Sequence, residues 1–114
     1  MYYRSMDTSQ AIDAFSALAH ETRLTVFRLL IKEGEQGLSA GIIAQQLEVR
    51  PSTLTAHLHI LRRSGLIQST RQRQKILYSA NILGTRELIR FLTQECCQGH
   101  PEICAELIDS VKVC

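Results

Sequence analysis

The sequence of 114 residues lacks any long apolar run. No stretch approaches the roughly 18 to 20 consecutive apolar residues that a membrane span needs. Residues 1–9 also lack the apolar core of a secretory signal peptide. We therefore expect a cytoplasmic protein that has no membrane partner.

Cysteine does not occur before position 96. The four cysteines, Cys96, Cys97, Cys104 and Cys114, are all close to one another in the sequence, whereas a disulfide-stapled secreted fold spreads its cysteines along the chain. Their clustering predicts a site built from thiols rather than a set of structural disulfides.

Signs of an enzyme or of several domains are also missing. The chain contains no repeat, no low-complexity segment, no CxxC redox motif and no glycine-rich phosphate loop. Its hydrophobic content of 45% and charged content of 21% exclude a disordered or collagen-like chain. We expect residues 1–114 to form one domain that is not an enzyme. Because a domain of this size hides only about two-thirds of its unfolded surface, burial of more surface in a dimer would stabilise it.

Acidic residues are absent from residues 50–81, which carry a net charge of +6. The segments on either side, 1–49 and 82–114, each carry a net charge of −2. An ordinary solvated face mixes the two signs of charge, whereas a basic block inside an acidic chain indicates a localised contact with a polyanion.

The first half of the chain has the spacing of three short helices. Ser9 is a candidate N-cap for the first helix, and Ser39 is one for a third helix over Ala40–Leu47. Gly34 is expected to end the second helix, because glycine readily adopts positive φ. The apolar stripes are Ile12, Phe15 and Leu18, then Leu24, Phe27, Leu30 and Ile31, and then Ile42, Ile43 and Leu47, the predicted buried side of the third helix.

The second half predicts a fourth helix, a β-hairpin and a fifth helix. Pro51 suits the first position of a helix that runs toward Gly65. The β-prone segments Leu66–Thr70 and Ile76–Ala80 flank a polar turn over residues 71–74. The apolar face of the fifth helix consists of Leu83, Leu88, Phe91 and Leu92, and we expect this helix to reach Cys97 and to end at Gly99 and Pro101. The order of elements predicts a mainly α-helical winged helix-turn-helix with a small β-hairpin.

The fourth helix and the hairpin carry the candidate DNA contacts. At about 100° per residue, Leu54, Leu58 and Leu61 share the buried side of the helix. The predicted DNA-binding residues lie on the opposite side of the helix: Ser52, Thr53, Thr55, His59 and Arg63, together with the small residue Ala56. Of these, Thr53 lies nearer the flank. At the hairpin tip, Arg71, Arg73 and Lys75 suit phosphate or minor-groove contacts. His57 falls beside the apolar stripe, which favours a half-buried packing or hydrogen-bonding role over base reading.

Four sequence runs resemble the ArsR/SmtB family of winged-helix repressors: ALAHETRL at residues 17–24, LSAGIIA at 38–44, STLTAHLHILRRSGL at 52–66 and KILY at 75–78. The resemblance spans roughly residues 11–98. It implies a homodimer, built on the first and last helices, that binds a near-palindromic operator in double-stranded DNA without a cofactor and leaves it when an inducer binds. Glu21 stands where many members have proline, and the wing tip lacks the glycine that is common there.

The candidate inducer ligands are Cys96, Cys97 and Cys104. Residues 35–47 contain no cysteine and residues 83–95 contain no histidine or aspartate, so two other ligand sets known in the family are missing. Adjacent residues on an intact helix diverge by about 100°, but Gly99 and Pro101 are expected to open the helix beside the cysteine pair. The loop QGHPEI is long enough to bring Cys104 back, and three thiolates prefer a thiophilic ion to a hard cation.

This cysteine arrangement resembles that of the arsenite-responsive members, which carry a vicinal pair and a third cysteine after the last helix. The resemblance implies an arsenite-responsive repressor that trivalent arsenic, or antimonite, releases from DNA. The same residues leave an alternative open, because a disulfide from Cys96 or Cys97 to Cys104 would make the chain a thiol-redox sensor, and another thiophilic metal also fits. We expect Cys114 and His100 to lie outside the site.

Overall fold

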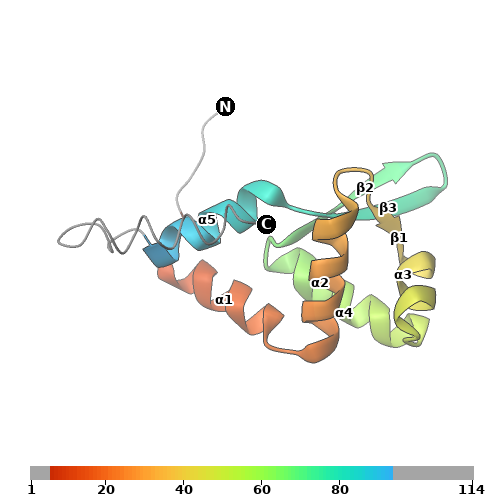
Figure 1. Cartoon of the computed structure of the whole chain (residues 1–114), viewed down its shortest axis with the longest axis horizontal. Helices are drawn as coiled ribbons and strands as arrows, with labels where there is room; N and C mark the ends of the chain where they lie inside the picture. Colours follow the sequence, from red (N-terminus) through yellow and green to blue (C-terminus); the bar gives the residue numbers. More distant parts are fainter. Residues whose placement is uncertain (1–5, 94–114) are drawn as a thin grey trace.

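The computed structural model describes residues 6–93. The elements follow the order predicted for a winged helix-turn-helix, with one additional short strand before the third helix. Their bounds are α1 (Thr8–Leu18), α2 (Glu21–Glu33), β1 (Leu38–Ser39), α3 (Ala40–Leu47), α4 (Pro51–Arg63), β2 (Ile67–Gln72), β3 (Lys75–Ala80) and α5 (Ile82–Thr93). Figure 1 shows the hairpin of β2 and β3 at one end of the described part and α1 with α5 toward the other.

The first helix differs from the prediction at its cap and in its buried side. Its N-cap is Asp7 rather than Ser9, because Asp7 and Gln10 form a capping box in which each side chain accepts a hydrogen bond from the other's backbone N–H, at 2.8 and 2.9 Å. Three alanines, Ala11, Ala14 and Ala17, form its buried side. Of the predicted stripe, Ile12 and Phe15 are exposed, at 59% and 39%, whereas Leu18 is partly buried and packs against the core.

The helix-turn-helix forms largely as predicted. The second helix ends at Gly34, which has a φ of 83°, and Ser39 caps α3 by accepting a hydrogen bond from Ile42 N–H at 3.3 Å. Ile43 is fully buried, but the prediction that Ile42 is buried was wrong, since its side chain is 42% exposed. Adjacent residues point about 100° apart on a helix, and Ala44 takes the second inward position of α3.

The leucine stripe of α4 lies at the centre of one cluster of buried apolar side chains. Leu54, Leu58 and Leu61 are each at most 2% exposed, which confirms the predicted buried side. They share this core with residues such as Leu30 of α2 and Ile43 of α3. Burial of a leucine side chain contributes about 1.5 to 3 kcal/mol, so the stripe fixes the face that α4 turns to the core.

The sheet has three antiparallel strands in the order β1-β3-β2. Sequence reasoning missed β1, a two-residue strand whose Leu38 pairs with Tyr78 of β3. Gly37 precedes it with a φ of 71°, and a Cβ there would lie 2.5 Å from the carbonyl oxygen of Tyr78. Only glycine therefore lets the chain enter the sheet at this point.

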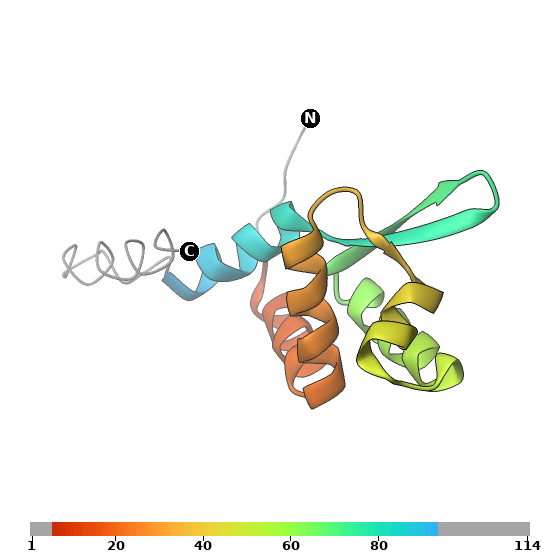
Figure 2. The same ribbon diagram turned by 45° about the vertical axis from the view of Figure 1, so that its right-hand side comes forward.

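The hairpin turn is shorter than predicted. Arg71 and Gln72 belong to β2, where Arg71 pairs with Ile76 and Gln72 pairs with Lys75, so the turn consists of Arg73 and Gln74 alone. Arg73 adopts a φ of 59°, in the region where the family's usual glycine would be relaxed. In Figure 2 the hairpin projects away from the helices as a wing.

Asn81 joins the end of β3 to the start of α5. Its side-chain oxygen accepts a hydrogen bond from Gly84 N–H at 3.1 Å, and its side-chain amide donates to the Gly65 carbonyl at 2.9 Å. Its own N–H donates to the Leu66 carbonyl. The start of α5 is thereby tied to the segment that follows α4. Within residues 6–93, no helix is both long and apolar enough to cross a membrane.

Replacing Asn81 by alanine should lower the free energy of unfolding by about 1 to 3 kcal/mol, because α5 loses its cap and the partly buried carbonyl of Gly65 loses its donor. Denaturant unfolding at one fixed protein concentration measures the change. Asn81→Asp is the matched control, since it keeps the capping oxygen and loses only the donor to Gly65. Its free energy of unfolding should lie between those of the unmodified chain and of Asn81→Ala. An Asn81→Ala variant as stable as the unmodified chain would contradict this role.

Candidate nucleic-acid interface

The structure places all of the predicted DNA-binding residues of α4 on its solvent side. The exposed side chains are Ser52, Thr53, Thr55, Ala56, His59 and Arg63. They lie on the surface opposite the three buried leucines, so α4 presents hydroxyls, an imidazole and a guanidinium outward. The Thr55 hydroxyl already donates to the Pro51 carbonyl at 2.9 Å, which leaves its oxygen free to accept and its methyl group exposed.

Arg62 is a residue of this surface that sequence reasoning missed. Its guanidinium donates to the Ser69 hydroxyl of β2 at 3.3 Å and so links α4 to the wing. The signal was present in the sequence, since Arg62 lies about 80° from the centre of the buried stripe on a helix that a hairpin follows directly. The contact adds a polar link between α4 and β2 on the exposed side of the molecule.

The cations of the wing gather at its tip. Arg71, Arg73 and Lys75 are all exposed. The Arg71 guanidinium donates to the Arg73 carbonyl at 3.4 Å, so this side chain folds over the turn. Lys75 follows the turn on the opposite strand. The tip can therefore present three positive charges to one phosphate backbone.

Among the described residues, no carboxylate forms an ion pair with the cations of α4 or the wing. Within residues 6–93 the one ion pair joins Arg90 to Glu87 at 3.5 Å, and both of these residues lie on α5. Residues 50–81 contain no acidic side chain. The exposed face of α4 and the wing therefore form one positively charged surface, which suits a polyanion such as DNA.

A pair of histidines and an arginine connects α4 to the corner between α1 and α2. The Nη1 atom of Arg23 lies 3.3 Å from Nδ1 of His57, and the rings of His20 and His57 have centroids 4.5 Å apart. Burial, and then the neighbouring His20 and Arg23, lower the pKa of His57 from its ordinary value of 6.5. The prediction of a half-buried, hydrogen-bonding His57 is confirmed.

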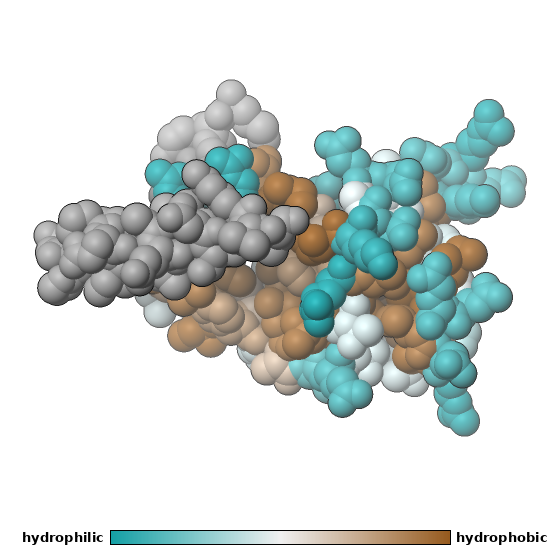
Figure 3. Space-filling view, viewed as in Figure 1, coloured by the Kyte–Doolittle hydropathy of each residue, from teal (hydrophilic) through white to brown (hydrophobic). Residues whose placement is uncertain are grey.

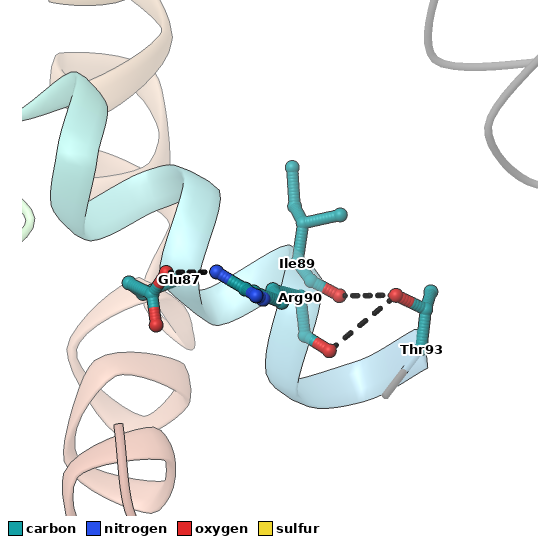
Figure 4. A network of polar contacts seen from close by, with 4 residues as sticks. All are labelled: Glu87, Ile89, Arg90 and Thr93. Carbon is teal, nitrogen blue, oxygen red and sulfur yellow. Dashed lines mark hydrogen bonds and ion pairs between the residues drawn. The ribbon is translucent and has the colours of Figure 1, made fainter. Parts of the chain in front are cut away.

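The described part of α5 ends just before the cysteines. Figure 4 shows its last turns, where Arg90 pairs with Glu87 and the Thr93 hydroxyl donates to the carbonyls of Ile89 and Arg90 at 3.0 and 3.4 Å. Cys96, Cys97, Cys104 and Cys114, like His100, lie outside the described residues. Among residues 6–93, no three histidine, cysteine, aspartate or glutamate side chains gather closely enough to hold a metal ion.

Large apolar side chains are exposed on α1 and α5. The most exposed are Leu92 at 60% and Ile12 at 59%. Others on the same two helices are Phe15, Ile82, Leu83 and Ile89. In the space-filling view apolar surface lies over α1, whereas hydrophilic side chains project around the end that carries the wing (Figure 3). Exposed apolar side chains also occur within the charged surface, namely Ile60 of α4 and Ile76 of the wing, but those of α1 and α5 are the more exposed group.

Comparisons with known proteins agree with this architecture. A family model described as a helix-turn-helix domain matches residues 18–70. The HTH-type transcriptional regulator YgaV of Escherichia coli K12 is 33% identical over 77% of this chain and 87% of its own length. The ArsR-like transcriptional regulator from Rhodococcus sp. RHA1 superposes with a TM-score of 0.70 at 25% identity, covering 85% of this chain and 89% of that one.

HlyU of Vibrio cholerae is similar in both sequence and structure. This protein, named a transcriptional activator, is 29% identical over 82% of this chain and 84% of its own length. Its structure superposes with a TM-score of 0.62 and covers 82% of this chain and 100% of that one. A structure of reduced HlyU superposes with a TM-score of 0.59 at 29% identity, over 80% and 93% of the two chains.

The order of elements, the basic outer face of α4 and the sequence matches lead to one identification. The similar proteins are transcriptional regulators with a DNA-binding helix-turn-helix fold, and this chain is likewise a regulator rather than an enzyme. The chain belongs to the ArsR family of winged helix-turn-helix transcriptional regulators.

Proposed function

We propose that this chain is a cytoplasmic repressor that binds operator DNA as a homodimer and is released by trivalent arsenic. The observation that carries the DNA contact is the positively charged surface formed by α4 and the wing. Ser52, Thr53, Thr55 and His59 would meet base edges, while Arg63 and the wing cations would lie along phosphates. No cofactor is required for this contact.

The apolar surface of α1 and α5 supports the homodimer. Side chains such as Ile12, Leu83 and Leu92 are about half exposed or more, and exposed groups of large apolar residues mark sites of association. A two-fold pair would present two copies of α4 to successive major grooves, about 34 Å apart. The near-palindromic operator implied by the family resemblance has the matching symmetry.

Cys96, Cys97 and Cys104 are the proposed ligands of the inducer, on the strength of their chemistry and spacing in the sequence. Three thiolates match the three bonds of trivalent arsenic, and antimonite fits the same set. The pair follows α5 by a few residues, so an ion bound there would act on a helix that carries the proposed dimer surface.

Release requires that the inducer binds the DNA-free dimer more tightly than the DNA-bound one. A coupling of about 1 to 3 kcal/mol would weaken operator binding about 5- to 150-fold. A change in the packing of α5 would alter the distance between the two copies of α4, because Asn81 ties α5 to the segment that follows α4.

A second candidate is a thiol-redox regulator that uses the same cysteines. It is favoured by the similarity to HlyU, which has been solved in a form described as reduced. In this alternative a disulfide from Cys96 or Cys97 to Cys104, rather than an arsenic ion, would change the end of α5.

Replacing Arg71 and Arg73 by alanine should flatten the salt dependence of operator binding. Each lost phosphate contact reduces the slope of log K against log salt by about 0.9, so the double variant should lose up to about 1.8. Fluorescence anisotropy with a duplex from the chain's own promoter region, titrated at several salt concentrations, measures the slope. The double variant Arg28→Ala, Arg86→Ala is the matched control, since both arginines are exposed and lie off α4 and the wing. Equal slopes for the two double variants would remove the wing from the phosphate contacts.

Replacing Cys97 by serine should leave DNA binding unchanged and abolish release by arsenite, because one thiolate is lost from the ligand set. The same anisotropy assay, with reduced protein and arsenite added in near-stoichiometric steps, provides the measurement. Cys114→Ser is the matched control and should release as the unmodified chain does. Normal release by Cys97→Ser would contradict the ligand assignment, and release by peroxide alone, reversed by dithiothreitol, would favour the redox regulator.

A further inference from the structure

We propose that Arg23 and His57 are positioning residues for DNA binding, and that their contact holds α4 in its binding orientation only while His57 is neutral. Operator affinity is therefore expected to fall in mild acid. This inference rests on the proposed function in one respect, namely that α4 contacts DNA.

Arg23 joins three helices at one point. Its Nε atom donates to the Ala17 carbonyl at 2.6 Å, near the end of α1, and its Nη1 atom faces Nδ1 of His57 on α4 at 3.3 Å. The carbonyls of the last helical turn lack partners within their own helix, so Arg23 satisfies one of these groups. The side chain thereby sets α4 against the corner between α1 and α2.

The contact of Arg23 with His57 is called the joint below. Its hydrogen bond requires one particular protonation state of His57. A guanidinium can only donate, so Nδ1 of His57 must accept and the proton of this ring must sit on Nε2. His20 is in the same tautomer, because its Nδ1 accepts from the backbone N–H of Thr22 at 3.1 Å. The His57 ring is therefore neutral in this arrangement.

Protonation of His57 would break the joint in two ways. The new Nδ1–H would face the N–H of Arg23, so that two donors oppose each other, and the imidazolium would stand beside a permanent positive charge. His20 and Arg23 are the charged or titratable groups that affect His57, and neither is acidic. Asp13, His59 and Arg63 line the adjoining groove between α1 and α4, on which Arg23 also borders.

The sign of the pH effect follows from the lowered pKa of His57. In a chain whose joint is open, this ring would titrate at its ordinary pKa, and in the closed joint it titrates at a lower pH. The contact is thus fully favourable above the ordinary pKa of 6.5 and is progressively lost as the pH falls below that value.

In the described part of the chain, few polar contacts supplement the packing of α4. Arg50, the N-cap residue, makes no side-chain hydrogen bond to the helix. The buried leucines fix the face that α4 turns to the core, and hydrogen bonds add a directional constraint that apolar contacts lack. Within residues 6–93 the polar ties from α4 side chains to other elements are His57 to Arg23 and Arg62 to Ser69, one on each side of the helix.

The test is the pH profile of operator affinity in a chain whose other α4 imidazole is removed by His59→Gln. Between about pH 7.5 and about pH 5.5, across the range in which imidazole titrates, we expect the Kd of this variant for the promoter duplex to rise about five- to tenfold. In His57→Gln, His59→Gln the amide oxygen can still accept from Arg23 but does not titrate, so the rise should disappear. The thermal unfolding of each variant, followed at both pH values, establishes that the chains compared are folded.

A further variant separates positioning from simple packing. His57→Leu, His59→Gln fills the space but offers Arg23 no acceptor, and its Kd near neutral pH should be about fivefold higher than that of the glutamine double variant. Two outcomes would overturn the inference: identical affinities for these two double variants, or a rise in Kd at low pH that persists in His57→Gln, His59→Gln. Absence of DNA binding by the unmodified chain at every pH would overturn the proposed function together with this inference, whereas binding with an unaltered pH profile would overturn the inference alone.

Discussion

The burial of three leucines of α4 is the constraint on which the rest of the molecule depends. Because Leu54, Leu58 and Leu61 are almost completely removed from water, the residues on the opposite side of the helix, such as Thr55 and His59, face outward. α2, α3 and β2 each pack against this helix. The core face and the proposed DNA-contact face are thus two sides of the same 13-residue element.

The first and last helices, α1 and α5, place their apolar residues differently from α4. In α1 the inward positions are alanines, which let the helix approach its neighbours closely, while isoleucine and phenylalanine are left outside. In α5 the buried positions include a glutamate that is paired with an arginine on the next turn, and leucines again remain exposed. Large apolar side chains on the outside, with small or polar ones inside, are unfavourable for an isolated protomer. This arrangement explains why association is central to the proposed function.

The sequence predicted the elements that depend on local chemistry. The cap at Ser39, the first position of α4 at Pro51 and the end of α2 at Gly34 all follow from side-chain or backbone preferences over a few residues, and all are present. The predicted outer face of α4 is also exposed, because a strong apolar stripe leaves little freedom in the rotation of a helix.

Features that depend on a partner distant in sequence could not be predicted. The strand β1 is two residues long and exists only because β3 supplies its hydrogen bonds. Arg23 and His57 are separated by 34 positions, and no pattern indicates that they meet. The N-cap of α1 is a local feature that was predicted wrongly, because Asp7 and Gln10 exchange two hydrogen bonds and so begin the helix before Ser9.

The tip of the wing combines a backbone requirement and a charge in one residue. Arg73 holds a left-handed conformation, which costs a residue other than glycine about 1 to 2 kcal/mol. Exchange for glycine would relax the backbone but remove a cation from the point that projects farthest from the helices. Selection for a less strained turn and selection for tighter DNA contact would therefore act on this position in opposite directions.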